Sequence, residues 1–322
     1  MDMKTDLFIV GAGPAGLTAA QYGARAGVGV TIAEQLAVGG QALLIDNLEN
    51  YPGNFVDKVA TKNGIPKSGF ELADAMKAQA EAFGAHFITG AVHAVTKNAD
   101  GFTVTMANGD LCRASAVIIA TGTKHKTLNI PGETEFYGKG VSYCATCDGP
   151  FFKNKKIFVI GGGDVAASEA VYLARLSKSV TLIHRRDKLR AQKVLADRVL
   201  HNPSITVRFN TRLVEVVGEQ KVASVILEDA VSDGYSDARI REEADAVFIF
   251  IGSTPQIPVI RGAVFETDSA GYVVTGQDMQ TSIQGLFAVG DCRKTPFRQV
   301  VVACGEGAIA AHCAAAYING AV

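Results

Sequence analysis

Two segments of the chain share one pattern: a short apolar run, a glycine-rich turn and a helix-forming stretch. The first segment covers residues 6–34 and carries Gly11, Gly13 and Gly16 in the spacing G-x-G-x-x-G. Glycines in this spacing permit a tight turn, close approach of the backbone to a pyrophosphate, and close helix–strand packing. The helix that follows then directs free N–H groups at the phosphates. The segment therefore predicts a dinucleotide-binding fold.

A second copy of the pattern begins near residue 156 and runs to about residue 190. Its turn carries Gly161 and Gly163, with Ala166 in place of the third glycine. A single glycine fingerprint is a weak signal, but here each copy lies between a strand-like run and a helix-forming stretch. The chain thus predicts two dinucleotide sites.

The two copies differ in charge at equivalent positions, 23 residues after the first glycine of each turn. The first copy has Glu34 there, whereas the second has His184, followed by Arg185, Arg186 and Arg190. A carboxylate suits a ribose 2′-hydroxyl, and guanidinium groups bind a 2′-phosphate. We expect the first site to bind an ADP-ribose without the extra phosphate and the second to bind NADP(H).

The repeat extends to two buried strand-like runs that end in glycine, AVIIATGT at 116–123 and AVFIFIGS at 246–253. The simplest arrangement is an α/β protein with two Rossmann-like dinucleotide-binding domains, each of three layers, the second inserted into the first. We expect residues 1–121 and 252–322 to form the first domain and residues 122–251 the second. Two single-strand connections of this kind make a plausible hinge.

A third glycine-containing turn follows the return to the first domain. Gly290 and Asp291 come directly after a short apolar run and precede an apolar helix. Asp291 can be a simple turn residue. Beside a dinucleotide site, we expect it to accept a hydrogen bond from a cofactor hydroxyl.

The segment SYCATCDGPFF places Cys144 and Cys147 two residues apart, directly before Asp148. A structural disulfide that closes so short a loop would contribute only ~2 kcal/mol. A zinc site needs four ligands, and the other cysteines are scattered, so we expect no metal. A reversible dithiol fits better. Asp148 is then a candidate acid/base for one sulfur, or alternatively a turn residue before Gly149.

Charge and hydropathy exclude several partners. The formal net charge of −1 gives no basic excess for nucleic acid or an anionic membrane. No uncharged apolar run reaches the ~18 residues of a membrane span, since residues 299–318 contain Glu306 and His312. A strand-like run from Asp6 leaves no room for a signal peptide. We therefore expect a soluble cytoplasmic protein.

Taken together, the motifs resemble those of the low-molecular-weight thioredoxin reductases over almost the whole chain. They are, in order, GAGPAG (11–16), GGQ (39–41), ENYPG (49–53), ATGT (120–123), GVSYCATCDGPFF (140–152), GGGDVA (161–166), HRRDKLR (184–190), AVGD (288–291) and RQV (298–300). A cysteine pair just after the first turn would indicate the larger reductases instead, and no cysteine precedes Cys112.

This resemblance implies an NADPH-dependent flavoprotein disulfide reductase that is a homodimer and reduces thioredoxin. It implies FAD in the first domain and NADPH in the second, Cys144 and Cys147 as the redox disulfide, and Asp148 as the acid. Rotation of the inserted domain would let the cysteine pair meet first the flavin and then the partner. We expect Cys147 to lie nearer the flavin.

Two sets of binding residues follow from the same resemblance. The residues that would contact FAD are Gly11, Gly13, Pro14, Ala15, Gly16, Glu34, Gly40, Gln41, Asn50, Val92, Ala120, Thr121, Gly122, Gly290, Asp291, Arg298, Gln299 and Val300. The residues that would contact NADPH are Gly163, Asp164, Val165, Ala166, His184, Arg185, Arg186, Arg190, Ile251 and Gly252.

One stretch departs from the family pattern: residues 51–70 are several residues longer, most simply a surface loop. This leaves the redox partner open, so a glutaredoxin-like carrier or a peroxidase partner is an alternative substrate. A flavin-dependent dithiol oxidase would not need the second nucleotide motif, and a ferredoxin–NADP electron transferase would not need the cysteine pair. A non-catalytic NADPH-sensing module would lack flavin.

Overall fold

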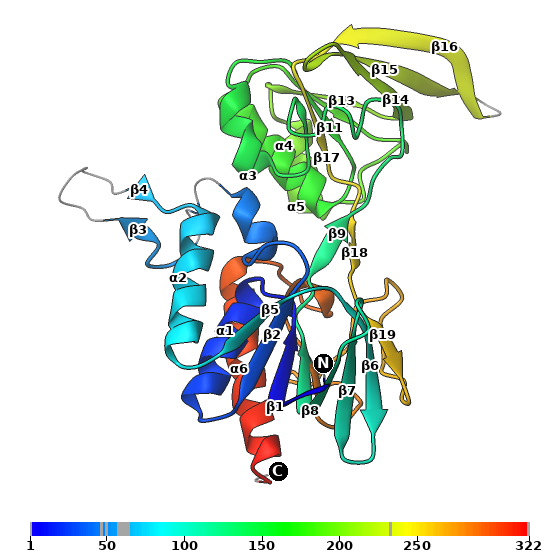
Figure 1. Cartoon of the computed structure of the whole chain (residues 1–322). Coiled ribbons are helices and arrows are strands. Elements are labelled where there is room, and N and C mark those ends of the chain that lie inside the picture. The colour runs from blue at the N-terminus through cyan, green and yellow to red at the C-terminus, as the bar shows by residue number, and fades with distance from the viewer. Residues whose placement is uncertain (1, 46–47, 49–50, 57–64, 232–233, 321–322) are drawn as a thin grey trace. The chain divides into compact units, whose positions relative to one another are not determined.

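The computed structural model describes residues 2–45, 48, 51–56, 65–231 and 234–320. The chain forms two compact units, Met1–Lys124 with Thr254–Val322, and His125–Ser253. Each unit is built on a largely parallel sheet with helices (Figure 1). The fold class is therefore α/β with the second unit inserted into the first, as predicted.

Most of the described helical residues lie in the first unit. Its elements are β1 (Asp2–Val10), α1 (Pro14–Arg25), β2 (Val30–Glu34), the 3-10 helix η1 (Gly40–Leu44), β3 (Phe55–Val56), β4 (Ile65–Pro66), α2 (Gly69–Ala82), β5 (His86–Thr89), β6 (Val92–Asn98), β7 (Gly101–Met106), β8 (Leu111–Ile119), β19 (Val259–Arg261), β20 (Leu286–Ala288), η3 (Gly290–Cys292) and α6 (Val300–Ile318).

The main sheet of this unit has the order β19-β6-β7-β8-β1-β2-β5, and β20 also pairs with β8. Strands β1, β2, β5, β8 and β20 run parallel, whereas β7 is antiparallel to both of its neighbours. Helices α1, α2 and α6 gather on one side of the parallel strands, and β6, β7 and β19 extend on the other (Figure 1). The carboxyl ends of the parallel strands thus meet at one edge, where ligands bind in such sheets.

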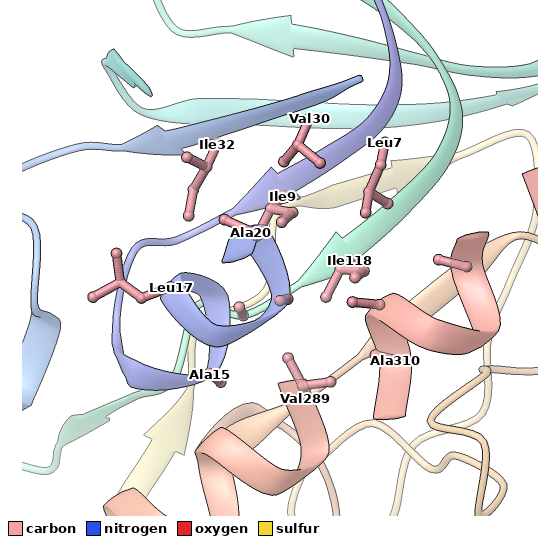
Figure 2. Packing of buried hydrophobic residues seen from close by; sticks show 14 of the residues in the cluster. Leu7, Ile9, Ala15, Leu17, Ala20, Val30, Ile32, Ile118, Val289 and Ala310 are labelled. Atoms are coloured by element: carbon pink, nitrogen blue, oxygen red, sulfur yellow. The ribbon is translucent and has the colours of Figure 1, made fainter. Parts of the chain in front are cut away.

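Alternate residues of each strand enter two separate cores. Leu7, Ile9 and Ile118 pack with the helices, and Figure 2 shows them opposite Leu17 and Ala310. The residues between them, such as Phe8, pack on the other face of the sheet. This separation follows from the period of two along a strand, because successive side chains point to opposite faces.

Helix α6 is long and apolar enough to cross a membrane by length and composition alone. In the fold it is a core helix of the first unit. The residues that it buries are Ala303, Cys304, Glu306, Gly307, Ala310, Ala311, Ala314 and Ala315.

The long segment at 51–70 carries two short strands. β3 and β4 pair antiparallel, with Phe55 opposite Pro66 and Val56 opposite Ile65. Residues 57–64, which include most of the extra length, lie outside the described residues. Ser68 then caps α2 in a capping box with Glu71.

The second unit combines a parallel sheet with an antiparallel one. Its elements are β10 (Val141–Ser142), α3 (Ala145–Asp148), η2 (Gly149–Phe152), β11 (Ile157–Ile160), α4 (Asp164–Leu176), β12 (Val180–Ile183), α5 (Lys193–Leu200), β13 (Ile205–Arg208), β14 (Thr211–Gly218), β15 (Val222–Val231), β16 (Gly234–Glu243) and β17 (Ala246–Ile249).

The parallel sheet of the second unit has the order β10-β17-β11-β12-β13, and the antiparallel sheet has the order β14-β15-β16. One core lies between the two sheets and includes Phe158 and Val225. The other includes Val159, Ala170 and Leu173, where the parallel sheet packs against α4. Three layers result: helices, parallel sheet, antiparallel sheet.

The chain passes between the units through β9 (Thr123–His125) and β18 (Ser253–Pro255), which pair with each other in a two-stranded sheet.

Candidate functional site

Two glycines of the turn between β1 and α1, Gly11 and Gly16, leave no room for a side chain. Gly11 has a φ of +100°, and a Cβ there would lie 2.6 Å from the carbonyl oxygen of Ala120. A Cβ on Gly16 would lie 1.9 Å from the carbonyl oxygen of Gly11. At Gly13, by contrast, no described atom lies within 4 Å of such a Cβ. Open space therefore remains at the start of α1, where Pro14 is the first helical residue and where a phosphate can bind the helix N–H groups.

Glu34 ends β2 beside this turn. Its carboxylate accepts hydrogen bonds from the N–H groups of Ala12 (2.8 Å) and Leu36 (3.0 Å). A carboxylate has about four acceptor sites, so capacity remains for a ribose hydroxyl. The N–H of Gly90 donates to the Glu34 carbonyl, which brings the start of β6, at Val92, to the same end of the sheet.

Two further predicted segments, residues 40–41 and 120–122, lie at the first turn. A Cβ on Gly40 would lie 3.2 Å from Cα of Gly13. The Gln41 side chain donates to the carbonyl oxygen of Thr123 (2.6 Å). Next to Gly122, Thr121 donates to the carbonyl oxygen of Gln256.

The loop after β20 joins the same cluster. Gly290 has a φ of +70°, and a Cβ there would lie 3.1 Å from Cβ of Ala15. Burial raises the pKa of Asp291, an effect that the positive charge of Arg298 opposes. Arg298 lies over the ring of Tyr272, 4.1 Å from its centroid. Gln299 caps α6 and Val300 begins it.

An ion pair that the sequence analysis did not identify holds this loop. Glu306 on α6 is 7% exposed, and its Oε2 accepts the N–H of Gly290 at 2.7 Å. Its Oε1 pairs with the guanidinium of Arg293, whose Nε donates to Thr275 (2.8 Å). The sequence feature that could have indicated this ion pair is an acidic residue within an apolar helix, because a buried charge needs a partner.

The structure thus brings together predicted residues from segments far apart in sequence. These are the first glycine turn, Glu34, and residues 40–41, 120–122 and 290–291. Asn50 lies outside the described residues. Open space at a helix start, next to a carboxylate that still has acceptor capacity, fits a dinucleotide. The contacts of individual residues with FAD stay a prediction.

The second turn repeats the first with closer packing. A Cβ on Gly161 would lie 2.4 Å from the carbonyl oxygen of Phe250 and 2.7 Å from Cβ of Ala166. Ala166 is buried, so alanine fits where the first turn has glycine. A Cβ on Gly163 would meet no described atom within 4 Å, and Val165 on the first turn of α4 is exposed. Space for a phosphate therefore remains here as well.

His184 follows β12 and is only 5% exposed. Its ring fills the space that a Cβ on Gly162 would need, at 2.3 Å. Burial and the neighbouring arginines lower the pKa of His184, so the ring is neutral. Its Nε2 has no hydrogen-bond partner among the described residues, which marks it as a group that a ligand can satisfy.

Arg185, Arg186 and Arg190 are exposed next to this ring. Together they place several positive charges where the second turn opens, as an additional phosphate would require. Gly252, with a φ of +107°, and Ile251 follow β17, directly after Phe250, whose carbonyl oxygen packs on Gly161.

Cys144 lies directly before α3 and is disulfide-bonded. Its N–H donates to Oγ of Ser142 at 3.0 Å, and its carbonyl accepts the N–H of Asp148 at 3.1 Å. Cys147 lies within α3, but its side chain is outside the described part of the chain. The pairing of Cys144 with Cys147 therefore stays a prediction.

Asp148 ends α3 and lines a cavity of about 170 Å³. The other lining residues include Ser142, Phe151 and Phe152. Phe151 is 70% exposed. Asp148 thus lies beside a small cavity, and its role in proton transfer stays a prediction.

The residue before Cys144 is anchored by a second buried acid that sequence reasoning missed. Glu133 is 2% exposed and accepts the Tyr143 hydroxyl at 2.7 Å, together with the N–H groups of Leu128 and Asn129. The Tyr143 ring stacks on His125 with centroids 5.4 Å apart. Burial and the bond to Glu133 raise the pKa of Tyr143, so the phenol keeps its proton and remains a donor.

Glu169 on α4 is a half-buried acid. Burial raises the pKa of Glu169 to about 7, and its Oε2 has no hydrogen-bond partner among the described residues. The other described cysteines, Cys112, Cys292, Cys304 and Cys313, are not disulfide-bonded. Burial raises the pKa of Cys292 to about 11, which makes it inert as a nucleophile.

Two glycine turns, each at the carboxyl ends of parallel strands, and a disulfide-bonded cysteine in the second unit define a redox protein with two dinucleotide-binding folds. Residues 5–307 match the family model for pyridine nucleotide-disulphide oxidoreductases. The chain belongs to this family.

Its relatives narrow the class. The thioredoxin reductase of Treponema pallidum (strain Nichols) is 52% identical over 320 residues, which cover 99% of each chain. The crystal structure of the thioredoxin reductase from Streptococcus pyogenes MGAS5005 is 39% identical with a TM-score of 0.78, over 99% of this chain and 100% of that one. The Lactococcus lactis enzyme in its FR conformation is 38% identical with a TM-score of 0.75, over 98% and 99%. Within the family, the chain therefore groups with the bacterial-type thioredoxin reductases, as its motifs predicted.

Proposed function

We propose that this chain is an NADPH-dependent flavoprotein that reduces the disulfide of thioredoxin. The observation that carries the proposal is that Cys144 is disulfide-bonded and lies in the second unit. The glycine turn of this unit opens beside three exposed arginines. The names of the relatives support the choice of thioredoxin. Another thiol carrier remains the alternative substrate.

The first unit is proposed to hold FAD through its glycine turn and Glu34, and the second to hold NADPH through Gly163 and its arginines. When bound, the two groups supply two-electron redox chemistry. The protein positions both groups. The N-termini of α1 and α4 bind the phosphates. The charged residues at the ends of β2 and β12 select between a ribose 2′-hydroxyl and a 2′-phosphate.

The proposed role of the cysteine pair is thiol–disulfide exchange. In the reduced enzyme, one thiolate attacks a sulfur of the partner disulfide, and a mixed disulfide forms as the partner thiolate leaves. The second cysteine then attacks the first, which restores the enzyme disulfide and releases the partner as a dithiol. Two electrons and two protons pass to the partner in total. Asp148 is proposed to hold or deliver one of the protons.

A homodimer, which the family resemblance implies, and a cytoplasmic location, which charge and hydropathy predict, belong to the same proposal. So does rotation of the second unit about its two connecting strands. Sedimentation of the purified protein tests the dimer: a species of one chain at micromolar concentration would contradict it.

Anaerobic titration with NADPH tests the redox pair. The wild type is expected to take up one dithiol's worth of electrons more than a Cys144→Ser, Cys147→Ser variant. Cys313→Ser is the matched control, because Cys313 is a free cysteine, and it should titrate like the wild type. Equal uptake by the wild type and the double variant would refute a redox-active pair. Turnover with thioredoxin and with a glutaredoxin-like protein then separates the two substrates.

A further inference from the structure

The segment that carries the third arginine is bonded to the second glycine turn. The carbonyl of Gly162 accepts the N–H groups of Arg190 (2.6 Å) and Ala191 (3.1 Å). The main chain of Arg190 is therefore fixed on the turn that would approach the pyrophosphate.

Asp164 continues this link. It is the first residue of α4, where a negative charge is favoured by the helix dipole. Its Oδ1 accepts the N–H of Gln192 at 2.7 Å, and its Oδ2 accepts the Gln192 side chain at 3.1 Å. Both carboxylate oxygens thus hold a residue two positions after Arg190. The resemblance assigned Asp164 to the coenzyme, whereas in this structure the carboxylate is bonded to Gln192.

The opposite side of the turn is closed by His184. The ring of His184 lies against Gly162, and the backbone N–H of His184 donates to the carbonyl of Arg208 at 2.9 Å. The turn therefore contacts a buried ring and is bonded to the segment 190–192, so that loss of the bonds to this segment would let the main chain of Arg190 move.

We propose that Asp164 and Gln192 are specificity-determining positioning residues. They hold the segment of Arg190 against the turn, and thereby keep its guanidinium where it can meet the 2′-phosphate that distinguishes NADP(H) from NAD(H). The proposal rests on the proposed function for its coenzyme. Neither side chain needs to contact the phosphate, so loss of either should impair one coenzyme selectively.

Calorimetric titration of the FAD-containing enzyme with NADP⁺ and with NAD⁺ tests this role without turnover. Asp164→Ala removes both bonds and should weaken NADP⁺ binding about tenfold, and Gln192→Ala removes only the side-chain bond and should weaken it about threefold. Binding of NAD⁺ should change less than about twofold in both variants. Asp164→Asn keeps an oxygen that can accept the Gln192 N–H and should retain most of the affinity.

Lys193→Ala is the matched control. It removes a positive charge next to Gln192 but breaks only the ion pair of Lys193 with Asp197 on α5 (2.7 Å). An equal loss of NADP⁺ affinity in this control would show that any change next to Gln192 weakens binding, and would overturn the positioning role. Variants that weaken both coenzymes equally would overturn it as well, while the proposed function would stand. A wild type that does not prefer NADP⁺ would overturn both.

Discussion

Replacing Glu169 by glutamine should remove a loss of stability that the wild type suffers as pH rises. The side chain lies on α4 in the second unit, and burial raises its pKa to about 7 from an ordinary value of 4.5. Its Oε2 has no hydrogen-bond partner among the described residues. Ionisation in the folded protein therefore places an unpaired carboxylate in a poorly solvated site.

The sign follows from proton binding. The folded chain keeps the proton of Glu169 in the range where the unfolded chain has lost it, so the free energy of unfolding falls as pH rises from 4.5 towards 7. Each unit of difference in pKa corresponds to about 1.4 kcal/mol, which gives a loss of roughly 2–3 kcal/mol between about pH 5 and about pH 8. Glutamine has a similar shape and no charge, so the variant should not lose this amount.

Urea-induced unfolding, followed by circular dichroism at both pH values, measures the effect. The quantity of interest is the change in unfolding free energy between the two pH values in the wild type, minus the same change in Glu169→Gln, because other titrating groups cancel. Glu219→Gln, an exposed substitution in the same unit, is the control and should behave like the wild type. Identical pH dependence in the wild type and Glu169→Gln would refute the reasoning.

Three other substitutions test the buried contacts. Arg293→Met leaves the carboxylate of Glu306 buried without its counter-ion and should cost about 3–5 kcal/mol in urea unfolding; adding Glu306→Gln should recover part of this, and strictly additive losses would contradict the pairing. Tyr143→Phe removes one donor to Glu133 and should lower the unfolding free energy by about 1–2 kcal/mol; an unchanged urea midpoint would show that the bond contributes nothing. Gly16→Ala places a methyl group 1.9 Å from the Gly11 carbonyl oxygen and should yield protein that has lost its flavin absorbance on purification; a fully yellow variant would show that the turn can relax.

The parts of the fold set by local pattern were predictable from sequence. The second copy of the pattern, from about residue 156 to about 190, predicted a strand, a glycine turn and a helix, and β11 and α4 lie within it in that order. Helix α1 begins at Pro14, inside the glycine turn, because proline is tolerated in the first turn of a helix. The expected surface loop at 51–70 includes paired strands, a long-range feature that no local pattern reported.

The candidate site was predictable where function requires a particular residue type. Glycines, Glu34 and the arginine cluster are positions of this kind: in the first unit Glu34 lies beside its glycine turn, and in the second unit the segment of Arg190 is bonded to its own turn. The partners of buried acids were not predictable. Glu306 meets Arg293 across a turn, and Glu133 meets Tyr143 across ten residues. Such pairs form only when the loops pack in the folded chain. The sequence alone does not show which residue will lie next to a buried acid.

The packing of His184 on Gly162 also bears on how the sequence can vary. Any side chain at position 162 would collide with the ring, so replacement of that glycine alone would expel a buried imidazole and disturb the neighbouring arginines. A smaller residue at position 184 would have to arise first, or at the same time. These two positions, 22 apart in the chain, should therefore change together in descendants of this protein, and changes of coenzyme preference that pass through this turn should require paired substitutions.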